Sequence, residues 1–447
     1  GSDRTTSCIP AKMKSYREIF RLVWPIALGM ANNALMQFVD RAFLAKEATS
    51  SLQAVLPAST LAWVFLSFFQ SVVGYSGVFV AQYFGKNDLK GARSCLWAGF
   101  WIAVFSGVIL VGMVPLGDWI FSLTSKTGEI LAKQRQYYDI VMFGGFLVCI
   151  HMAVTSYFTG CGRTRMVFWV NLVGNVINIA LDPIFIFTFE LGISGAAMAT
   201  VASQLAQVLI LVCYAIRELK GDEEVFSVEK IRSILKFGVF AGGYDILNMA
   251  SFTIFVFVTG RTAGIEFAAS NACFTINYLL FAPMMGFAVG AQTLVGQSLG
   301  AGDVRSARIN LRRTACLGLG IVSVFSALVL IFSTPILSIF APTDISESAR
   351  FMEIGFKLLV IMAAWMVFDA FDVILSGALK AAGDTRFVFL WMFFTAFMIW
   401  LPHVFYVFCR KGDVVDLWET MLVYVLIITG GSLLRWMLGS WRKRAIL

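Results

Sequence analysis

The chain of 447 residues is strongly apolar: 59% of its residues are hydrophobic, only 14% are charged, and its mean hydropathy is +0.80. This composition excludes a water-soluble globular protein and indicates a protein of the lipid bilayer. The net charge of +8 comes without a basic run interleaved with aromatic residues, so it indicates membrane topology and contact with anionic lipid rather than binding to nucleic acid.

The residue types that catalysis and metal binding require are scarce. The eight cysteines form no CxxC or other ligand spacing, and the only histidines are His151 and His403, which leaves no His-rich metal site. The sequence contains no HExxH or GxSxG motif and no polar domain that could hold a nucleotide. We therefore predict that the protein is not an enzyme and has no cofactor.

Twelve apolar segments are long enough to cross a bilayer, which takes about 20 helical residues. Their hydropathy is continuous rather than alternating, which excludes a β-barrel. The sequence thus predicts an all-α membrane protein with twelve transmembrane helices. The segments are centred near residues 32, 66, 105, 148, 178, 205, 246, 280, 325, 366, 397 and 428.

The distribution of positive charge predicts the orientation in the membrane. Of the 35 Lys and Arg residues, 24 lie in loops on the side of the N-terminus and 10 in loops on the opposite side. Because positive loops stay in the cytoplasm, both termini are expected to be cytoplasmic. We expect a multi-pass protein of a bacterial cytoplasmic membrane that works as a monomer.

The first and fifth spans carry polar stripes. The first span has Asn33, Gln37 and Asp40, and the fifth has Asn171, Asn175, Asn178 and Asp182, all at steps of three or four residues that place them on one helix face. A carboxylate at the bilayer centre costs about 2.5–3.5 kcal/mol, so these stripes are expected to face each other or a wet cavity. Two carboxyl groups with amide and hydroxyl oxygens can hold a proton or Na⁺. The alternative is hydrogen bonding between helices.

Pro25 lies in the middle of the first apolar run, fifteen residues before Asp40. Proline removes a backbone hydrogen bond and clashes with the preceding turn. We therefore predict a hinge at Pro25, so that a helix carrying a titratable acid could switch between two shapes.

The second half has different acids. Asp245 lies in the seventh span, and Asp369 and Asp372 lie three residues apart in the tenth. Together with the aromatic residues nearby they are candidates for a cavity that binds an organic cation, although Asp245 could instead be a solvated group at a helix end. Arg435, inside the last span, is expected either to pair with a carboxylate of the tenth span or to contact substrate.

The two halves are related by an internal repeat. The pattern Gln-x-x-Gly-x-x-Asp-x-x-x-Ala-Arg begins at Gln82 and again at Gln297, 215 positions later. The most polar internal stretch lies between the copies, which predicts lobes at 1–216 and 233–447 joined by a cytoplasmic linker at 217–232. Duplicated membrane proteins usually work by moving one copy against the other around a site at their interface. The acid of each motif copy, Asp88 or Asp303, is expected to cap a helix or to form an ion pair at the cytoplasmic helix ends.

Several segments together resemble the multidrug and toxic compound extrusion (MATE) transporters over nearly the whole chain. They are Trp24-Pro25, Val39-Asp40, Gln82 to Arg93, Gly162 to Arg165, Asn178 to Pro183, Gly195 to Thr200, Gln297 to Arg308, and Asp369 to Arg386. The resemblance implies two homologous six-helix lobes that export cationic or amphiphilic compounds in exchange for Na⁺ or H⁺. It implies a cation site at Asp40, Asn178, Asp182 and Thr200, and thus adds Thr200 to the residues that periodicity indicates.

The chain departs from the family pattern at three positions. Asn248 stands where members with a second ion site in the C-terminal lobe have Glu, Asp372 stands where Gln is common, and Arg41 stands where a small residue is usual. At the positions that correspond to Asp40 and Asp182, the second half has Phe255 and His403. The ion chemistry is therefore expected mainly in the first half.

The prediction from the sequence is a secondary active antiporter of small organic cations or amphiphilic drugs that works by alternating access. Its cation site is Asp40, Asn178, Asp182 and Thr200, where Na⁺ or H⁺ is the coupling ion, and its substrate cavity is lined by Asn33, Gln37, Asn175, Asp369 and Asp372. The alternatives are a lipid-linked-sugar flippase of the wider superfamily and a passive channel.

Overall fold

The computed structural model describes residues 13–122, 128–260, 264–342, 344–410, 412–439 and 441. Within these ranges the chain is helical, with no β-strand, and it contains twelve spans long and apolar enough to cross a membrane. The prediction of an all-α protein with twelve transmembrane helices in two lobes is therefore confirmed.

The N-terminal lobe contains six spans, some of them made of two consecutive helices. Its helices are α1 (Tyr16–Glu47), α2 (Thr49–Gly74), α3 (Ser76–Gly85), α4 (Leu89–Gly112), α5 (Val114–Ser122), α6 (Glu129–Gly160), α7 (Thr164–Pro183), the π-helix η1 (Ile184–Thr188) and α8 (Gly192–Ile216).

The C-terminal lobe repeats this arrangement. Its helices are α9 (Val228–Thr259), α10 (Ile265–Gly300), α11 (Val304–Ile331), α12 (Ser333–Ser338), α13 (Ile345–Ala381), α14 (Thr385–Phe394), the π-helix η2 (Thr395–Trp400), α15 (Leu401–Cys409) and α16 (Val414–Leu438).

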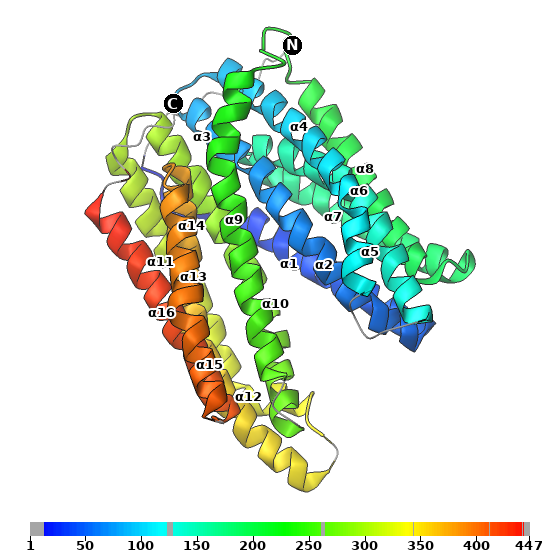
Figure 1. Ribbon diagram of the computed structural model, residues 1–447. Helices are drawn as coiled ribbons and strands as arrows, with labels where there is room; N and C mark the ends of the chain where they lie inside the picture. Colours follow the sequence, from blue (N-terminus) through cyan, green and yellow to red (C-terminus); the bar gives the residue numbers. More distant parts are fainter. Residues whose placement is uncertain are drawn as a thin grey trace.

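The two lobes meet on one side of the molecule and diverge toward the other (Figure 1). The start of α1 and the end of α16 lie on the side where the lobes meet, which we call the terminal side. Contacts between the lobes are made mainly by α1 with α10, α2 with α9, and α3 with α10. The lobes are thus in close contact on the terminal side, and their backbones lie farther apart toward the other side.

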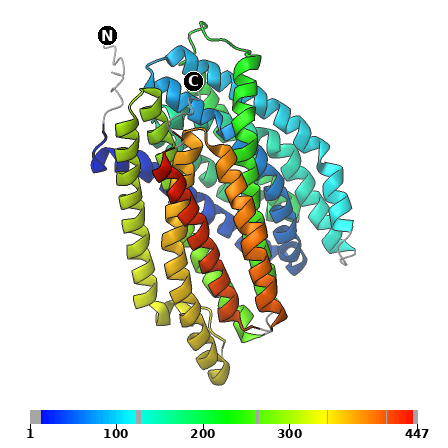
Figure 2. The same ribbon diagram turned by 60° about the vertical axis from the view of Figure 1, so that its left-hand side comes forward.

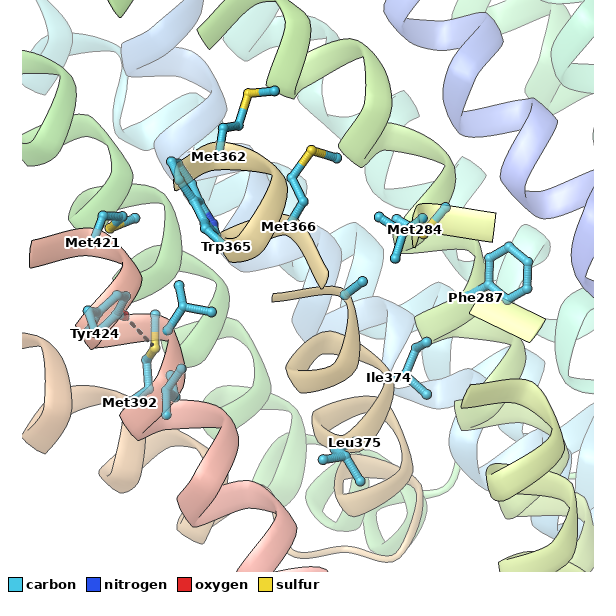
Figure 3. Packing of buried hydrophobic residues seen from close by; sticks show 14 of the residues in the cluster. Met284, Phe287, Met362, Trp365, Met366, Ile374, Leu375, Met392, Met421 and Tyr424 are labelled. Atoms are coloured by element: carbon cyan, nitrogen blue, oxygen red, sulfur yellow. Dashed lines mark hydrogen bonds between the residues drawn. The ribbon is translucent and has the colours of Figure 1, made fainter. Parts of the chain in front are cut away.

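The two largest apolar clusters are centred one in each lobe, and each is extended by one helix of the other lobe, α1 or α9. In the C-terminal lobe α13 is the most deeply buried span, packed between α10 and α16 (Figure 2). Figure 3 shows this packing: Met362, Trp365 and Met366 of α13 lie among Met284 and Phe287 of α10, and Met421 and Tyr424 of α16. Apart from α1 and α9, which contribute to both sides of the interface, each cluster holds the helices of its own lobe together.

Backbone geometry supports the repeat seen in the sequence. Gly162 and Gly383 end corresponding helices with φ of +80° and +78°, a left-handed conformation that glycine adopts without strain. The side chain of Asp88 accepts a hydrogen bond from the Gly91 amide at 2.8 Å, and that of Asp303 from the Ser306 amide at 2.9 Å. Both acids are helix caps, as predicted, and the bonds from Ser306 hold the pKa of Asp303 below its ordinary value.

The segment between α8 and α9 is fixed to the N-terminal lobe by the first motif copy. Arg93 of that copy forms ion pairs of 3.0 Å with both Asp222 and Glu223. Glu223 also accepts hydrogen bonds from the amides of Lys220 at 2.6 Å and Gly221 at 2.8 Å. Burial favours the neutral acid, but these hydrogen bonds outweigh it and lower the pKa of Glu223 to about 2.

We expect the Glu223→Gln substitution to speed hydrogen exchange at the Lys220 and Gly221 amides about tenfold, because bonds to a charged acceptor are worth about 1.5–3 kcal/mol. Since the pKa in the folded protein lies below the ordinary value of 4.5, the bonds should be complete at neutral pH and be lost as the pH falls toward 2. Exchange measured by mass spectrometry checks this. Asp222→Asn is the matched control, because it alters the ion pair with Arg93 and should leave these two amides protected.

Candidate functional site

Three of the four predicted cation-site residues form a hydrogen-bonded group in the N-terminal lobe. In the amide orientation that the surrounding groups require, Asn178 of α7 donates to the Asp40 carboxylate of α1 at 2.9 Å. Its carbonyl oxygen accepts from the Thr200 amide of α8 at 3.3 Å. Helices α1, α7 and α8 therefore converge on Asn178, which is fully buried.

The fourth residue, Asp182, is fully buried and lies beside Asp40. None of the described residues donates a hydrogen bond to either of its carboxylate oxygens. Asp40 is half-buried and lines the adjoining cavity. Two adjacent carboxylates in such a site repel each other, and they can form a hydrogen bond only if one of them holds a proton. The pair thus fits a shared proton or a small cation.

The orientation of the Asn178 side-chain amide decides which ion fits between Asp40 and Asp182. As oriented, its N–H group faces Asp40, an arrangement that suits a proton shared between Asp40 and Asp182. Rotating the amide by half a turn would place its oxygen there instead, and Na⁺ would then have oxygen ligands from two carboxylates and an amide. The group can therefore serve either ion, with Asn178 adapting to each.

A cavity adjoins the cluster of Asp40, Asn178, Asp182 and Thr200, which we call the cation group. Its lining includes Gln37, Asp40, Arg41, Trp63, Tyr137 and Thr200. Arg41 and Asp40 are neighbours on α1 that face the same cavity, so it has both an acidic and a basic wall. Sequence reasoning missed Trp63 and Tyr137, because neither stands out from the apolar spans that contain them.

The polar stripe of α7 makes contacts with different partners along its length. Asn175 donates to Asn33 of α1 at 2.8 Å, and Asn171 bonds to His151 of α6 at 3.0 Å. Gln37 accepts from Tyr278 of α10 at 3.4 Å, which is a contact between the lobes. The stripes of α1 and α7 therefore do face each other, and Asn171 and His151 satisfy each other inside the lobe.

Pro25 is buried inside α1, which runs without interruption from Tyr16 to Glu47. The carbonyl of Leu22, in the turn before the proline, accepts a hydrogen bond from the Thr164 hydroxyl at 2.8 Å. The predicted hinge stays a prediction, since a continuous helix represents only one of its two shapes.

The acids of the C-terminal lobe lie apart from the cation group. Asp372 is buried and accepts hydrogen bonds from Ser432 at 2.7 Å and Tyr244 at 3.3 Å. Asp369, partly exposed, lies one turn away on α13. Asp245 forms an ion pair with Lys380 at 3.0 Å, so it is not merely solvated.

Arg435 was expected to pair with a carboxylate of the tenth span or to contact substrate. Its ion-pair partner is a different acid. Its guanidinium binds both carboxylate oxygens of Asp384, at 2.6 and 3.2 Å, and Asp384 lies beyond the end of α13. A carboxylate of the tenth span is therefore not the acid with which it pairs.

Comparison with known proteins matches both lobes. The family model MatE matches residues 25–184 and again 244–406. The "Probable multidrug resistance protein NorM" of Thermotoga maritima is 25% identical, over 96% of this chain and 94% of that protein. The "Uncharacterized transporter YisQ" of Bacillus subtilis is 24% identical, over 83% and 82%.

Solved structures share the fold. One described as the outward-facing conformation of a multidrug resistance MATE family transporter superposes with a TM-score of 0.86 at 18% identity, covering 96% of this chain and 97% of that one. A MOP superfamily transporter from Pyrococcus furiosus, described as having a binding pocket of reversed polarity, superposes with a TM-score of 0.88 at 18% identity, covering 99% and 100%.

Proposed function

Because the chain belongs to the MatE family of multi-pass membrane transporters, we propose that it is a secondary active antiporter that exports small organic cations or amphiphilic drugs in exchange for Na⁺ or H⁺. The observation that carries the proposal is the adjacent pair Asp40 and Asp182, of which Asp182 is fully buried and Asp40 is half-buried and lines a cavity in the N-terminal lobe. A proton or Na⁺ that binds the pair changes the charge of the cavity wall, and so changes its affinity for a cation.

In this proposal the lobes 1–216 and 233–447 rock against each other as a monomer, joined by the linker at 217–232. The terminal side is cytoplasmic, in a bacterial cytoplasmic membrane, so the state described here opens outward. Gln37 lines the cavity of the N-terminal lobe, and Asn33 and Asn175, which bond to each other outside its lining, join the substrate site as it opens. Asp369 and Asp372 supply the acids of the other lobe. Pro25 allows α1 to change shape as the ion binds.

The test is export of a fluorescent organic cation from proteoliposomes, with Na⁺ and pH gradients imposed separately. We expect transport that saturates with substrate and runs uphill only with one of the gradients. If the substrate moves only down its own concentration gradient, whatever ion gradient is imposed, the protein is a passive channel. Binding of an anionic lipid-linked sugar, with no response to organic cations, would support the flippase instead.

A further inference from the structure

The two copies of the repeated motif pack directly against each other on the terminal side. Gly85, at the end of α3, lies so close to α10 that a Cβ atom there would overlap the carbonyl of Gln297. Likewise, a Cβ atom on Gly300, at the end of α10, would overlap the carbonyl of Gln82. The glycine of each copy thus allows the backbone that carries the other copy's glutamine to approach.

The two glutamine side chains form reciprocal hydrogen bonds between the lobes. Gln82 donates to the carbonyl of Ala381 at 2.9 Å, and Gln297 donates to that of Gly160 at 2.8 Å. Ala381 is the last residue of α13 and Gly160 the last of α6, which are corresponding helices of the two lobes. Carbonyl groups at a helix end lack a donor within the helix, so each lobe supplies the donor that the other needs.

Further bonds between the lobes lie on the same side. Tyr75, between α2 and α3, donates to the carbonyl of Lys380 at 2.7 Å. Lys14, just before α1, donates through its amide to Asn310 of α11 at 2.9 Å and through its ammonium group to the Gln297 side chain at 3.3 Å. Both glutamines are only 5% exposed, so this part of the interface is closed to water.

We propose that Gln82, Gly85, Gln297 and Gly300 form an inter-lobe latch that sets the balance between the two open states of the transporter. Both glutamine bonds must break before the terminal side can open, because each one joins a helix end in one lobe to the motif of the other. When water enters, it can take over the exposed carbonyl groups, so the latch resists opening without preventing it. The inference rests on alternating access as proposed above, and assigns Gln82 and Gln297 as positioning residues.

The test measures two distances between spin labels in the full chain, free of substrate and ion gradients. In a background without the native cysteines, one pair of labels at Lys86 and Arg305 reports the terminal side, and another at Gln53 and Ala268 reports the opposite side. All four positions are exposed. Opening of the terminal side lengthens the first distance and shortens the second.

We expect Gln82→Met, which keeps the size of the side chain and removes its donor, to raise the ratio of terminal-side-open to terminal-side-closed molecules about threefold to tenfold. Gln297→Met should do the same, and the double variant should have close to the product of the two effects. The matched control is Gln207→Met, because Gln207 is equally buried, at 5% exposed, on α8 within one lobe. It should leave both distances unchanged.

Tyr75→Phe tests the same interface if a methionine variant does not fold, because it removes one hydroxyl and should shift the ratio in the same direction. A loss of thermal stability with unchanged distances would overturn the latch and leave the glutamines a structural role. The distances are measured without transport. The latch hypothesis can therefore be rejected while export of organic cations is observed, and it can be supported while no export is observed. The two proposals are thus distinguishable.

Discussion

We expect the Asp40→Asn substitution to reduce gradient-driven export in proteoliposomes to the rate of protein-free vesicles. Asparagine can still accept the hydrogen bond that Asn178 gives to Asp40 at 2.9 Å, so the local structure should persist. It cannot release a proton, and its neutral side chain cannot balance the charge of Na⁺ next to Asp182. Binding of the ion and of the substrate would then no longer be linked.

Two further variants make the result specific to the cation group. Asp182→Asn should have the same effect, because it removes the other carboxylate of the pair. Asp88→Asn should leave transport intact, since Asp88 caps α4 through a hydrogen bond to the Gly91 amide, a role that asparagine also fills. Each variant is compared at equal amounts of folded protein. Undiminished export by Asp40→Asn would rule out the N-terminal cation group as the coupling site.

The fold could be predicted from the sequence because hydropathy fixes the number of spans and the repeated motif fixes their division into lobes. The stripes of α1 and α7 were predictable for a similar reason, since steps of three and four residues place side chains on one helix face. Periodicity could not find Thr200, Trp63 or Tyr137. These residues reach the site through the packing of helices distant in sequence, and a span's own pattern does not encode that packing.

The role of the repeated motif was also beyond the sequence alone. Repetition predicted that Gln82 and Gln297 are equivalent, and Asp88 and Asp303 were correctly predicted as caps. That each glutamine binds a helix end of the other lobe depends on how the lobes dock, since the partner carbonyls belong to the backbone and leave no mark on the sequence. The contact exists only in the docked arrangement of the two lobes.

The charges at one repeated position are exchanged between the lobes. Arg163 forms an ion pair with Glu218, which lies just beyond α8, the last helix of the first lobe. At the corresponding position the second lobe has Asp384, and its partner is Arg435 near the end of α16. In the first lobe the base lies at this position and the acid near the end of the last helix, and in the second lobe the order is reversed.

We expect the Arg435→Ala substitution to lower the free energy of unfolding by about 3–5 kcal/mol, the cost of removing one partner of a buried ion pair. Asp384 is fully buried, and the guanidinium contacts both of its oxygens and lies 4.7 Å from the centre of the Phe387 ring. The substitution removes this charge, the two hydrogen bonds and the cation–π contact together. Denaturant unfolding in detergent, followed by tryptophan fluorescence, measures the loss.

The double variant Asp384→Asn/Arg435→Gln is the decisive companion, because it removes the buried charge together with its partner and should recover most of the lost stability. Arg410→Ala is a matched control: Arg410 pairs with Asp416 at 3.5 Å, but both side chains are exposed, by 51% and 36%. Such a pair is worth at most about 1 kcal/mol. If Arg435→Ala and Arg410→Ala lowered the free energy of unfolding equally, the burial of Asp384 would add nothing to the stability that its ion pair contributes. A much larger loss at Arg435 that the double variant reverses would identify the pair as the main electrostatic link between α16 and the start of α14.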